Sequence, residues 1–250
     1  RLPIFFAGFR KEHIPYLCSM INDLKVTLLE TELAWESPGD NRKQIENDLL
    51  KDPKGTDLYV LPEMFTSGFT MNPQKVAEAM DGPTIEWLHD LSDQTKAAIC
   101  GSMVIKEKGY YVNRFVFVSP ETPLYYYDKK HTFTLAGEHR AYKAGTEKVV
   151  FEFKGWKICP MICYDLRFPV WSRNTEDYDL LIYVANWPKP RVNAWDALLK
   201  ARAIENMCYV AGLNRVGIDG SGVAHSGDSM VLDELGQELL VLTPSEHEVS

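Results

Sequence analysis

The fold is constrained most by short, almost wholly apolar runs that alternate with segments of helical spacing. Residues 57–61, 156–162 and 179–185 are such runs. A strand without alternating polar residues is typical of a sheet that is covered on both faces. Residues 83–97 and 193–207 have the spacing of amphipathic helices that would cover such a sheet. The sequence therefore predicts an α/β protein with layers in the order helix, sheet, sheet, helix.

The other predicted elements alternate along the chain in the same way. A helix is expected over residues 40–51, with Asp40 as its N-cap, and turns are expected at Lys108–Gly109 and Glu234–Gly236. Further strands are expected at residues 24–30, 98–105, 111–118, 124–128, 148–153, 209–216 and 229–233. With 250 residues, of which 45% are hydrophobic, the chain can bury a substantial core.

We expect a single domain over residues 20–250. Residues 1–19 are expected to precede the first strand as an upstream extension, with Met20 as a plausible natural start. The apolar run in this extension is short and is interrupted near its start by Pro3, which does not fit a signal peptide.

Cys163 stands where an apolar strand is expected to turn toward a helix. It directly follows the run 156–162 and precedes a helix-compatible stretch. Backbone N–H groups at such a turn can stabilise a thiolate, and also the oxyanion that forms when sulfur attacks a carbonyl carbon. A lone free cysteine is more often a small buried hydrophobe, so this alternative stays open for the residue taken alone.

Two more polar residues follow predicted strands. Glu63 comes just after the run 57–61. In open α/β sheets, functional residues collect beyond the carboxyl ends of the strands, so Glu63 is placed to act as a general base. Lys129 follows an aromatic strand, and a lysine there can stabilise the negative charge of a tetrahedral intermediate. Taken alone, Glu63 could also be an ordinary loop carboxylate, and Lys129 could also be an ordinary surface charge.

Together these motifs resemble those of the nitrilase superfamily of carbon–nitrogen hydrolases. The resemblance rests on Leu-Pro-Glu at 61–63, Lys-x-His at 129–131 and Cys-Tyr-Asp-Leu-Arg-Phe-Pro at 163–169, in this order. Asn-Trp-Pro at 186–188 and Asn-Arg-Val-Gly at 214–217 add to it. The resemblance implies a four-layer α-β-β-α sandwich and subunits that pair into a homo-oligomer, a dimer or larger.

The resemblance also implies roles for individual residues. Glu63 would be the base, Lys129 the oxyanion stabiliser and Cys163 the nucleophile that forms a thioester. The backbone N–H of Tyr164 would assist Lys129 at the oxyanion. Lys129 is preferred over Lys130 because the lysine of the family lies two residues before the histidine.

Members of this family often have a second glutamate between the lysine and the cysteine. Glu138 is the candidate here, in the supporting role of contacting the lysine and the substrate. Glu147 lies nearby in the same loop and is the alternative.

The resemblance is closest to the omega-amidase branch, which hydrolyses the terminal amide of short dicarboxylate monoamides such as 2-oxoglutaramate. Such a substrate is anionic at its far end, and Arg167 is a candidate to bind that carboxylate. A structural ion pair with Asp165 is an equal alternative for Arg167. Phe65, Phe69 and Trp187 are candidate apolar walls of the substrate pocket, and ordinary core packing is their alternative.

Two alternative functions remain open. A different amidase or a carbamoylase of the same superfamily is the first, because pocket loops decide the substrate. A catalytically silent scaffold subunit is the second. The presence of all three residues, Glu63, Lys129 and Cys163, at strand ends argues against the scaffold.

Composition limits the partners. The net charge of −8 argues against nucleic acid and acidic membranes as partners, and no apolar stretch is long enough for a membrane span. Five cysteines in a chain of this length do not indicate a disulfide scaffold, so we expect a reduced, cytoplasmic protein. The histidines and cysteines lack metal-ligand spacing and no nucleotide motif is present, so we expect no metal and no cofactor.

Overall fold

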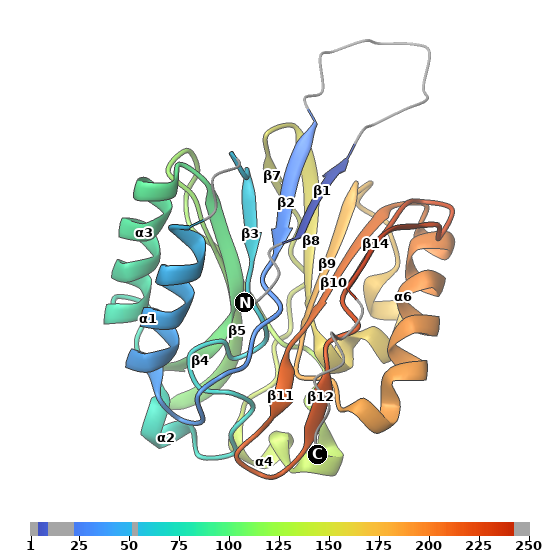
Figure 1. Cartoon of the computed structure of the whole chain (residues 1–250). Coiled ribbons are helices and arrows are strands. Elements are labelled where there is room, and N and C mark those ends of the chain that lie inside the picture. Colours follow the sequence, from blue (N-terminus) through green and yellow to red (C-terminus); the bar gives the residue numbers. More distant parts are fainter. Residues whose placement is uncertain (1–4, 10–22, 52–54, 243–250) are drawn as a thin grey trace, which may run out of the picture.

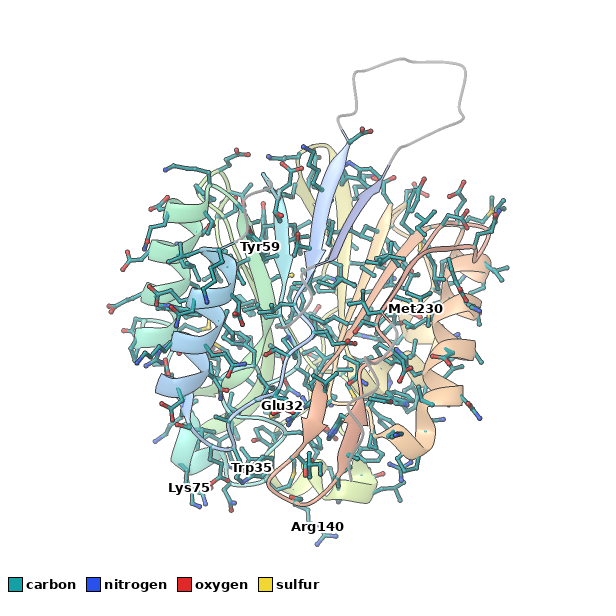
Figure 2. All side chains as sticks on the ribbon, viewed as in Figure 1. Glu32, Trp35, Tyr59, Lys75, Arg140 and Met230 are labelled. Atoms are coloured by element: carbon teal, nitrogen blue, oxygen red, sulfur yellow. The ribbon has the colours of Figure 1, made fainter. Side chains whose placement is uncertain are left out.

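The structure, a computed structural model, describes residues 5–9, 23–51 and 55–242. Two six-stranded sheets face each other, and helices cover the outer face of each sheet (Figure 1). The predicted four-layer α-β-β-α sandwich is therefore confirmed. Side chains fill the spaces between all four layers, as Figure 2 shows.

The first sheet has the strand order β1-β2-β3-β4-β5-β6. Strands β2, β3 and β4 are parallel, whereas β1, β5 and β6 each run antiparallel to a neighbour. Its strands are β1 (Phe5–Phe9), β2 (Leu24–Leu28), β3 (Leu58–Val60), β4 (Ala98–Glu107), β5 (Tyr110–Val118) and β6 (Tyr125–Asp128). Helices α1 (Pro38–Leu49) and α3 (Pro83–Thr95) cover its outer face, and α3 turns Ile85, Leu88 and Leu91 inward.

The second sheet has the strand order β14-β13-β10-β9-β8-β7, with β8, β9 and β10 parallel. All six residues of β9 are buried, as its apolar run predicts for a strand covered on both faces. Its strands are β7 (Phe151–Phe153), β8 (Trp156–Ile162), β9 (Leu180–Ala185), β10 (Tyr209–Asn214), β13 (Met230–Leu232) and β14 (Glu238–Val241). Helix α6 (Val192–Asn206) covers its outer face, where Leu199 and Trp195 lie over Gly212 of β10.

Aromatic side chains join the two sheets across the middle of the sandwich. The ring of Phe117, on β5, lies 4.7 Å from that of Phe151 and 5.2 Å from that of Phe153, centroid to centroid. Tyr125, on β6, stacks on Phe151 at 4.5 Å. Large aromatic surfaces buried in this way contribute strongly to stability, so the sheets are held at a fixed spacing.

Short elements gather at the end of the sandwich where the parallel strands finish (Figure 1). They are α2 (Pro73–Val76), α4 (Glu138–Ala141), the hairpin of β11 (Val216–Ile218) with β12 (Ala224–Ser226), and the 3-10 helix Cys163–Arg167 that leads into α5 (Pro169–Ser172). In open α/β sheets, this end of the strands is where functional groups collect.

Three expectations from the sequence need correction. Phe5–Phe9 forms β1 and pairs with β2, so part of the segment expected to precede the first strand belongs to the sheet. Helix α1 begins at Pro38, and Asp40 lies in its first turn, where it accepts a hydrogen bond from Ser37 Oγ at 2.6 Å. A proline at the first helical position fits because its missing N–H has no partner there in any case. The short strands β11, β12 and β14 were not predicted, because their residues are partly exposed and lack strong alternation.

The stability of the sandwich should depend on the wholly buried strand β9. Leu181→Ala removes a side chain with no exposed surface, and we expect it to lower the free energy of unfolding by about 2–5 kcal/mol. Urea unfolding measures this. Leu239→Ala, at a site that is 47% exposed on β14, should change the same free energy by less than about 0.5 kcal/mol. Equal effects of the two variants would contradict the assignment of β9 to the core.

Candidate active site

Three strand ends bring Glu63, Lys129 and Cys163 together. Glu63 follows β3, Lys129 follows β6 and Cys163 follows β8. The ammonium nitrogen of Lys129 lies 2.7 Å from Glu63 Oε1, and the charges of Glu63, Lys129 and Glu138 all act on the thiol of Cys163. Glu63 has no exposed surface, Lys129 is 1% exposed and Cys163 is 8% exposed. The cluster is therefore shielded from water on nearly all sides.

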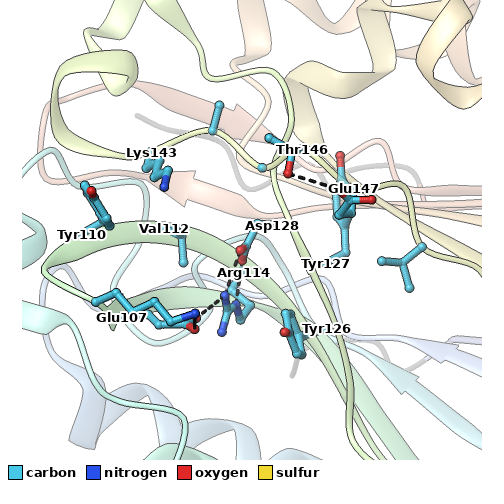
Figure 3. Close-up of a pocket in the computed structure, with 14 residues that line it drawn as sticks. Glu107, Tyr110, Val112, Arg114, Tyr126, Tyr127, Asp128, Lys143, Thr146 and Glu147 are labelled. Atoms are coloured by element: carbon cyan, nitrogen blue, oxygen red, sulfur yellow. Dashed lines mark hydrogen bonds and ion pairs between the residues drawn. The ribbon is translucent and has the colours of Figure 1, made fainter.

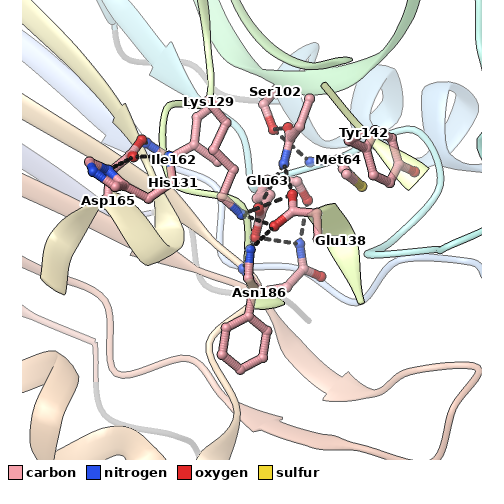
Figure 4. Close-up of polar contacts among 12 residues, drawn as sticks. Glu63, Met64, Ser102, Lys129, His131, Glu138, Tyr142, Ile162, Asp165 and Asn186 are labelled. Atoms are coloured by element: carbon pink, nitrogen blue, oxygen red, sulfur yellow. Dashed lines mark hydrogen bonds and ion pairs between the residues drawn. The ribbon is translucent and has the colours of Figure 1, made fainter. Parts of the chain in front are cut away.

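Glu138 completes the surroundings of the lysine (Figure 4). Its carboxylate oxygens lie 3.1 and 3.0 Å from Lys129 Nζ, and the backbone N–H of Phe133 also donates to it. Glu147 is exposed, and its carboxylate accepts a hydrogen bond from the hydroxyl of Thr146 at 3.3 Å. Of the two candidate glutamates, the structure brings Glu138 to the lysine.

Two asparagines that were not predicted as site residues hold the Glu63 carboxylate in place. Asn113 Nδ2 donates to Glu63 Oε1 at 2.8 Å and to Glu138 at 3.3 Å. The backbone N–H of Asn186 donates to Glu63 Oε2 at 2.9 Å. The sequence gives only weak signals that these two asparagines belong to the site. Asn113 is a polar residue within the largely apolar strand β5, and Asn186 follows β9 in the Asn-Trp-Pro sequence.

Burial and charge act against each other in this cluster. Burial alone would lower the pKa of Lys129, but the carboxylates of Glu138 and Glu63 outweigh it and hold that pKa above its ordinary value. Burial raises the pKa of Glu138, and the nearby charge of Glu63 adds to the increase although Lys129 opposes it. One ammonium is thus shared by a pair of buried carboxyl groups.

Cys163 occupies a special backbone position. Its φ of 45° lies in the left-handed region, where β8 gives way to the 3-10 helix. Burial raises the pKa of the Cys163 thiol well above its ordinary value, and the charge of Glu63 raises it further, against the influence of Lys129. This direction agrees with the expectation that Glu63 acts as a general base toward the thiol.

Asp165 ties the strand that carries Lys129 to the turn that carries Cys163. Its Oδ1 accepts the backbone N–H of His131 at 2.9 Å and lies 2.8 Å from His131 Nδ1. Its Oδ2 accepts the hydroxyl of Tyr127 at 2.8 Å and the N–H of Ile162 at 3.1 Å. This network fixes the spacing between the lysine and the cysteine.

Aromatic side chains surround the cluster. The ring centroid of Phe69 lies 5.1 Å from Lys129 Nζ, and the ring of Tyr164 lies 5.0 Å from that of Phe133. Trp187 is 3% exposed and its backbone N–H donates to Asn214 Oδ1 at 2.7 Å. Tyr164 and Phe69 therefore lie beside the groups expected to react, and Trp187 directly follows Asn186, whose backbone N–H donates to Glu63.

Two of the candidate substrate-binding residues have other surroundings. Phe65 has no exposed surface and packs in the layer between the first sheet and its helices, 6.4 Å from the ring of Trp87. It is a core residue and not a pocket wall. Arg167 is exposed, and its guanidinium lies 4.9 Å from the ring of Trp187. Within the described chain, Asp165 is satisfied by other donors, so the alternative ion pair with Arg167 does not form.

A separate surface pocket lies over β5, β6 and the loop that follows α4 (Figure 3). Its floor holds Arg114, whose Nε and Nη2 donate to Asp128 at 2.6 and 2.8 Å and which also pairs with Glu107 at 2.6 Å. Glu63, Lys129 and Cys163 do not line this pocket. Because its charges are paired with one another, it carries no comparable set of reactive groups.

Residues 5–9, 23–51 and 55–242 contain no group of three or more His, Cys, Asp or Glu side chains arranged to hold a metal ion. They contain no helix long and apolar enough to cross a membrane.

An α-β-β-α sandwich with Glu, Lys and Cys buried at its strand ends defines a hydrolase of carbon–nitrogen bonds. The sequence matches the carbon-nitrogen hydrolase family over residues 22–250, and the chain belongs to that family. It is 47% identical over 227 residues to omega-amidase YafV of Escherichia coli strain K12, covering 91% of this chain and 87% of that protein. It is 33% identical to the 2-oxoglutaramate amidase of Bacillus subtilis, over 86% of this chain and 84% of the relative.

Solved structures agree with this membership. The CN-hydrolase superfamily protein XC1258 of Xanthomonas campestris superposes with a TM-score of 0.87 at 43% identity, over 90% of this chain and 88% of that one. Its crystal structure has an arsenic adduct in the active site. An amidase from Nesterenkonia superposes with a TM-score of 0.80 at 21% identity, over 89% of this chain and 87% of that one, and so shares the fold.

Removing the buried cation should destabilise the protein in a pH-dependent way. Lys129→Leu leaves the carboxyl groups of Glu63 and Glu138 buried without a cation, and we expect a loss of about 3–5 kcal/mol in the free energy of unfolding near pH 8. Protonation relieves that penalty, so the folded variant binds more protons than the unfolded chain and its stability falls as the pH rises. The deficit should therefore be smaller near pH 5. Wild-type Lys129 stays charged in both states over this range, because its pKa is raised.

Lys130→Leu is the matched control, since Lys130 is half-buried against the ring of Trp171 at 5.0 Å. Urea unfolding of both variants at pH 5 and pH 8 measures how far each loss in the free energy of unfolding depends on pH. A loss for Lys129→Leu that does not depend on pH would contradict the buried-charge interpretation.

Proposed function

We propose that this protein is an omega-amidase, which hydrolyses the terminal amide of a short dicarboxylate monoamide to a carboxylate and ammonia. The observation that carries the proposal is the shared interaction at Glu63. This one buried carboxylate accepts a hydrogen bond from the Lys129 ammonium at 2.7 Å and acts through its charge on the Cys163 thiol. A nucleophile, its base and a cation are thus held in one network.

Acylation begins with the neutral thiol. As Cys163 Sγ attacks the amide carbon, its proton passes to the Glu63 carboxylate and the carbonyl oxygen becomes an oxyanion. Lys129 Nζ and the N–H of Tyr164 stabilise this oxyanion, and Glu138 keeps the lysine in place. When the carbon–nitrogen bond breaks, Glu63 returns the proton to the nitrogen. Ammonia leaves and a thioester remains on Cys163.

Deacylation repeats these steps with water. Glu63, again ionised, takes a proton from a water molecule as its oxygen attacks the thioester carbon. The second tetrahedral intermediate has its oxyanion at the same position, beside Lys129. The carbon–sulfur bond breaks, Glu63 protonates the departing sulfur, and the carboxylic acid is released. The net reaction consumes one water and frees one ammonia.

The substrate proposal draws on the relatives and on the rim of the site. Two relatives carry the names omega-amidase and 2-oxoglutaramate amidase. Arg167 and Arg191 are exposed, and each lies near an aromatic residue beside the cluster, Trp187 at 4.9 Å and Phe133 at 5.4 Å. Two cations at the rim favour a substrate whose far end is a carboxylate. We assign the anchoring role to Arg167.

We also propose that the protein works in the cytoplasm as a homo-oligomer, with the small amide as its substrate. Large apolar side chains are exposed on α5 and at the C-terminal end of α6, and they support pairing with a second copy. Val170 is 91% exposed, Ile204 55% and Met207 81%. Light scattering of the purified protein tests the assembly, and a mass of one chain at micromolar concentration would contradict it.

Ammonia release should depend on one thiol. With 2-oxoglutaramate as the substrate, Cys163→Ala should lower kcat at least about 1000-fold, because no other group can form the acyl intermediate. Cys159→Ala, four residues earlier on the same buried strand, should keep most of the activity. A coupled assay for ammonia measures both variants. Retained turnover in Cys163→Ala would contradict the assignment of the nucleophile.

Arg167 should matter only for anionic substrates. Arg167→Ala should raise KM for succinamate about tenfold and leave KM for the neutral amide butyramide nearly unchanged, since one charged hydrogen-bonding partner is lost. Steady-state kinetics on the two amides give the comparison. Equal changes for both substrates would remove the anchoring role from Arg167.

A further inference from the structure

One polar atom beside Glu63 has no partner. Asn186 is 5% exposed, and its Nδ2 donates to the backbone oxygen of Glu63 at 2.6 Å. Its side-chain oxygen, Oδ1, is buried and accepts no hydrogen bond from any residue of the described chain. Leaving a buried acceptor unpaired costs about 1–3 kcal/mol, so such an atom requires an explanation.

The orientation of this side chain is fixed by its neighbours. Nitrogen and oxygen of an asparagine amide are assigned from the hydrogen bonds around them. If the amide of Asn186 were turned over, Oδ1 would face the carbonyl oxygen of Glu63 at 2.6 Å, where two acceptors would repel. The free atom is therefore the oxygen, which accepts and cannot donate.

The place of Asn186 in the sheet puts this oxygen next to the reacting atoms. β8 and β9 are parallel neighbours, with Ile162 paired to Val184. Cys163 follows directly after β8, and Asn186 follows directly after β9. Both residues also lie near the carboxylate of Glu63.

The proposed reaction requires the leaving nitrogen at the same position. The nitrogen receives its proton from Glu63, so it must lie within hydrogen-bond distance of that carboxylate. Asn186 already approaches Glu63 Oε2, with its backbone nitrogen at 2.9 Å and Nδ2 at 3.5 Å. A carboxamide has two N–H groups, and its bound nitrogen would bring one of them toward Asn186.

We propose that Asn186 Oδ1 accepts a hydrogen bond from the N–H of the substrate carboxamide and so selects amides at this site. The contact orients the leaving nitrogen, with its lone pair toward the proton on Glu63. An ester of the same acid has no N–H to offer and would leave Oδ1 unpaired. This assignment rests on the proposed function only in requiring an acyl substrate at Cys163.

Asn113 provides a contrast in the same cluster. It also donates to Glu63, at 2.8 Å, but through Oε1. Its own oxygen is satisfied by the hydroxyl of Ser102 at 2.8 Å. Asn113 thus positions the base and has no free acceptor for the substrate, which makes it the matched control.

The test compares an amide with an ester of the same acyl group. Values of kcat/KM are measured for succinamate and monomethyl succinate, and for the neutral pair butyramide and methyl butyrate. Because kcat/KM covers the steps up to departure of the leaving group, it reports the contact at the nitrogen. Asn186→Ala should lower kcat/KM for the amide about tenfold more than for the matching ester. The ratio of the two values is unaffected by any loss of folded protein.

Asn113→Ala should lower both values in equal proportion, because it disturbs only the position of Glu63. An unchanged amide-to-ester ratio in Asn186→Ala, or an equal change in Asn113→Ala, would overturn the inference. Failure of the proposed function has a different signature. In that case the wild type would turn over the neutral pair and not the succinyl pair, while the effect of Asn186 would still be measured on the neutral pair.

Discussion

The ammonium of Lys129 lies 2.7 Å from the carboxylate of Glu63 in a part of the interior that water barely reaches. A buried ion pair is a weak source of stability, but breaking it leaves an uncompensated charge at a high cost. The two residues are 66 positions apart and follow the strands β3 and β6 of the first sheet. The fold must therefore hold these two strand ends at fixed positions, and every other group at the site is placed relative to this pair.

The second sheet supplies the rest of the chemistry to that pair. β8 ends just before Cys163 and β9 ends just before Asn186, and both residues lie near Glu63. The sandwich thus brings the proposed base and cation of one sheet to the proposed nucleophile of the other. Burial raises the pKa of the Cys163 thiol, and in the proposed mechanism its proton passes to Glu63 as the sulfur attacks.

Much of this could be predicted from the sequence, for physical reasons that differ by residue. The run at β9 predicted a strand covered on both faces, because a continuous apolar stretch has few other stable solutions. Glu63, Lys129 and Cys163 stood out because each ends an apolar or aromatic run. Asn113 and Asn186 did not stand out, since their role depends on contacts with Glu63 across 50 and 123 residues. Phe65 was expected in the pocket, but a phenylalanine two residues after Glu63 can point to either side of the sheet, and here it faces the helices.

The central claim is that the reaction passes through an acyl group on the enzyme that no longer contains the leaving group. Hydroxylamine competes with water for such an intermediate and converts it to a hydroxamate. The most direct measurement is the ratio of hydroxamate to acid formed from succinamate and from monomethyl succinate at one hydroxylamine concentration. A common thioester predicts the same ratio from both substrates. Different ratios would show that no shared acyl-enzyme exists and would contradict the account.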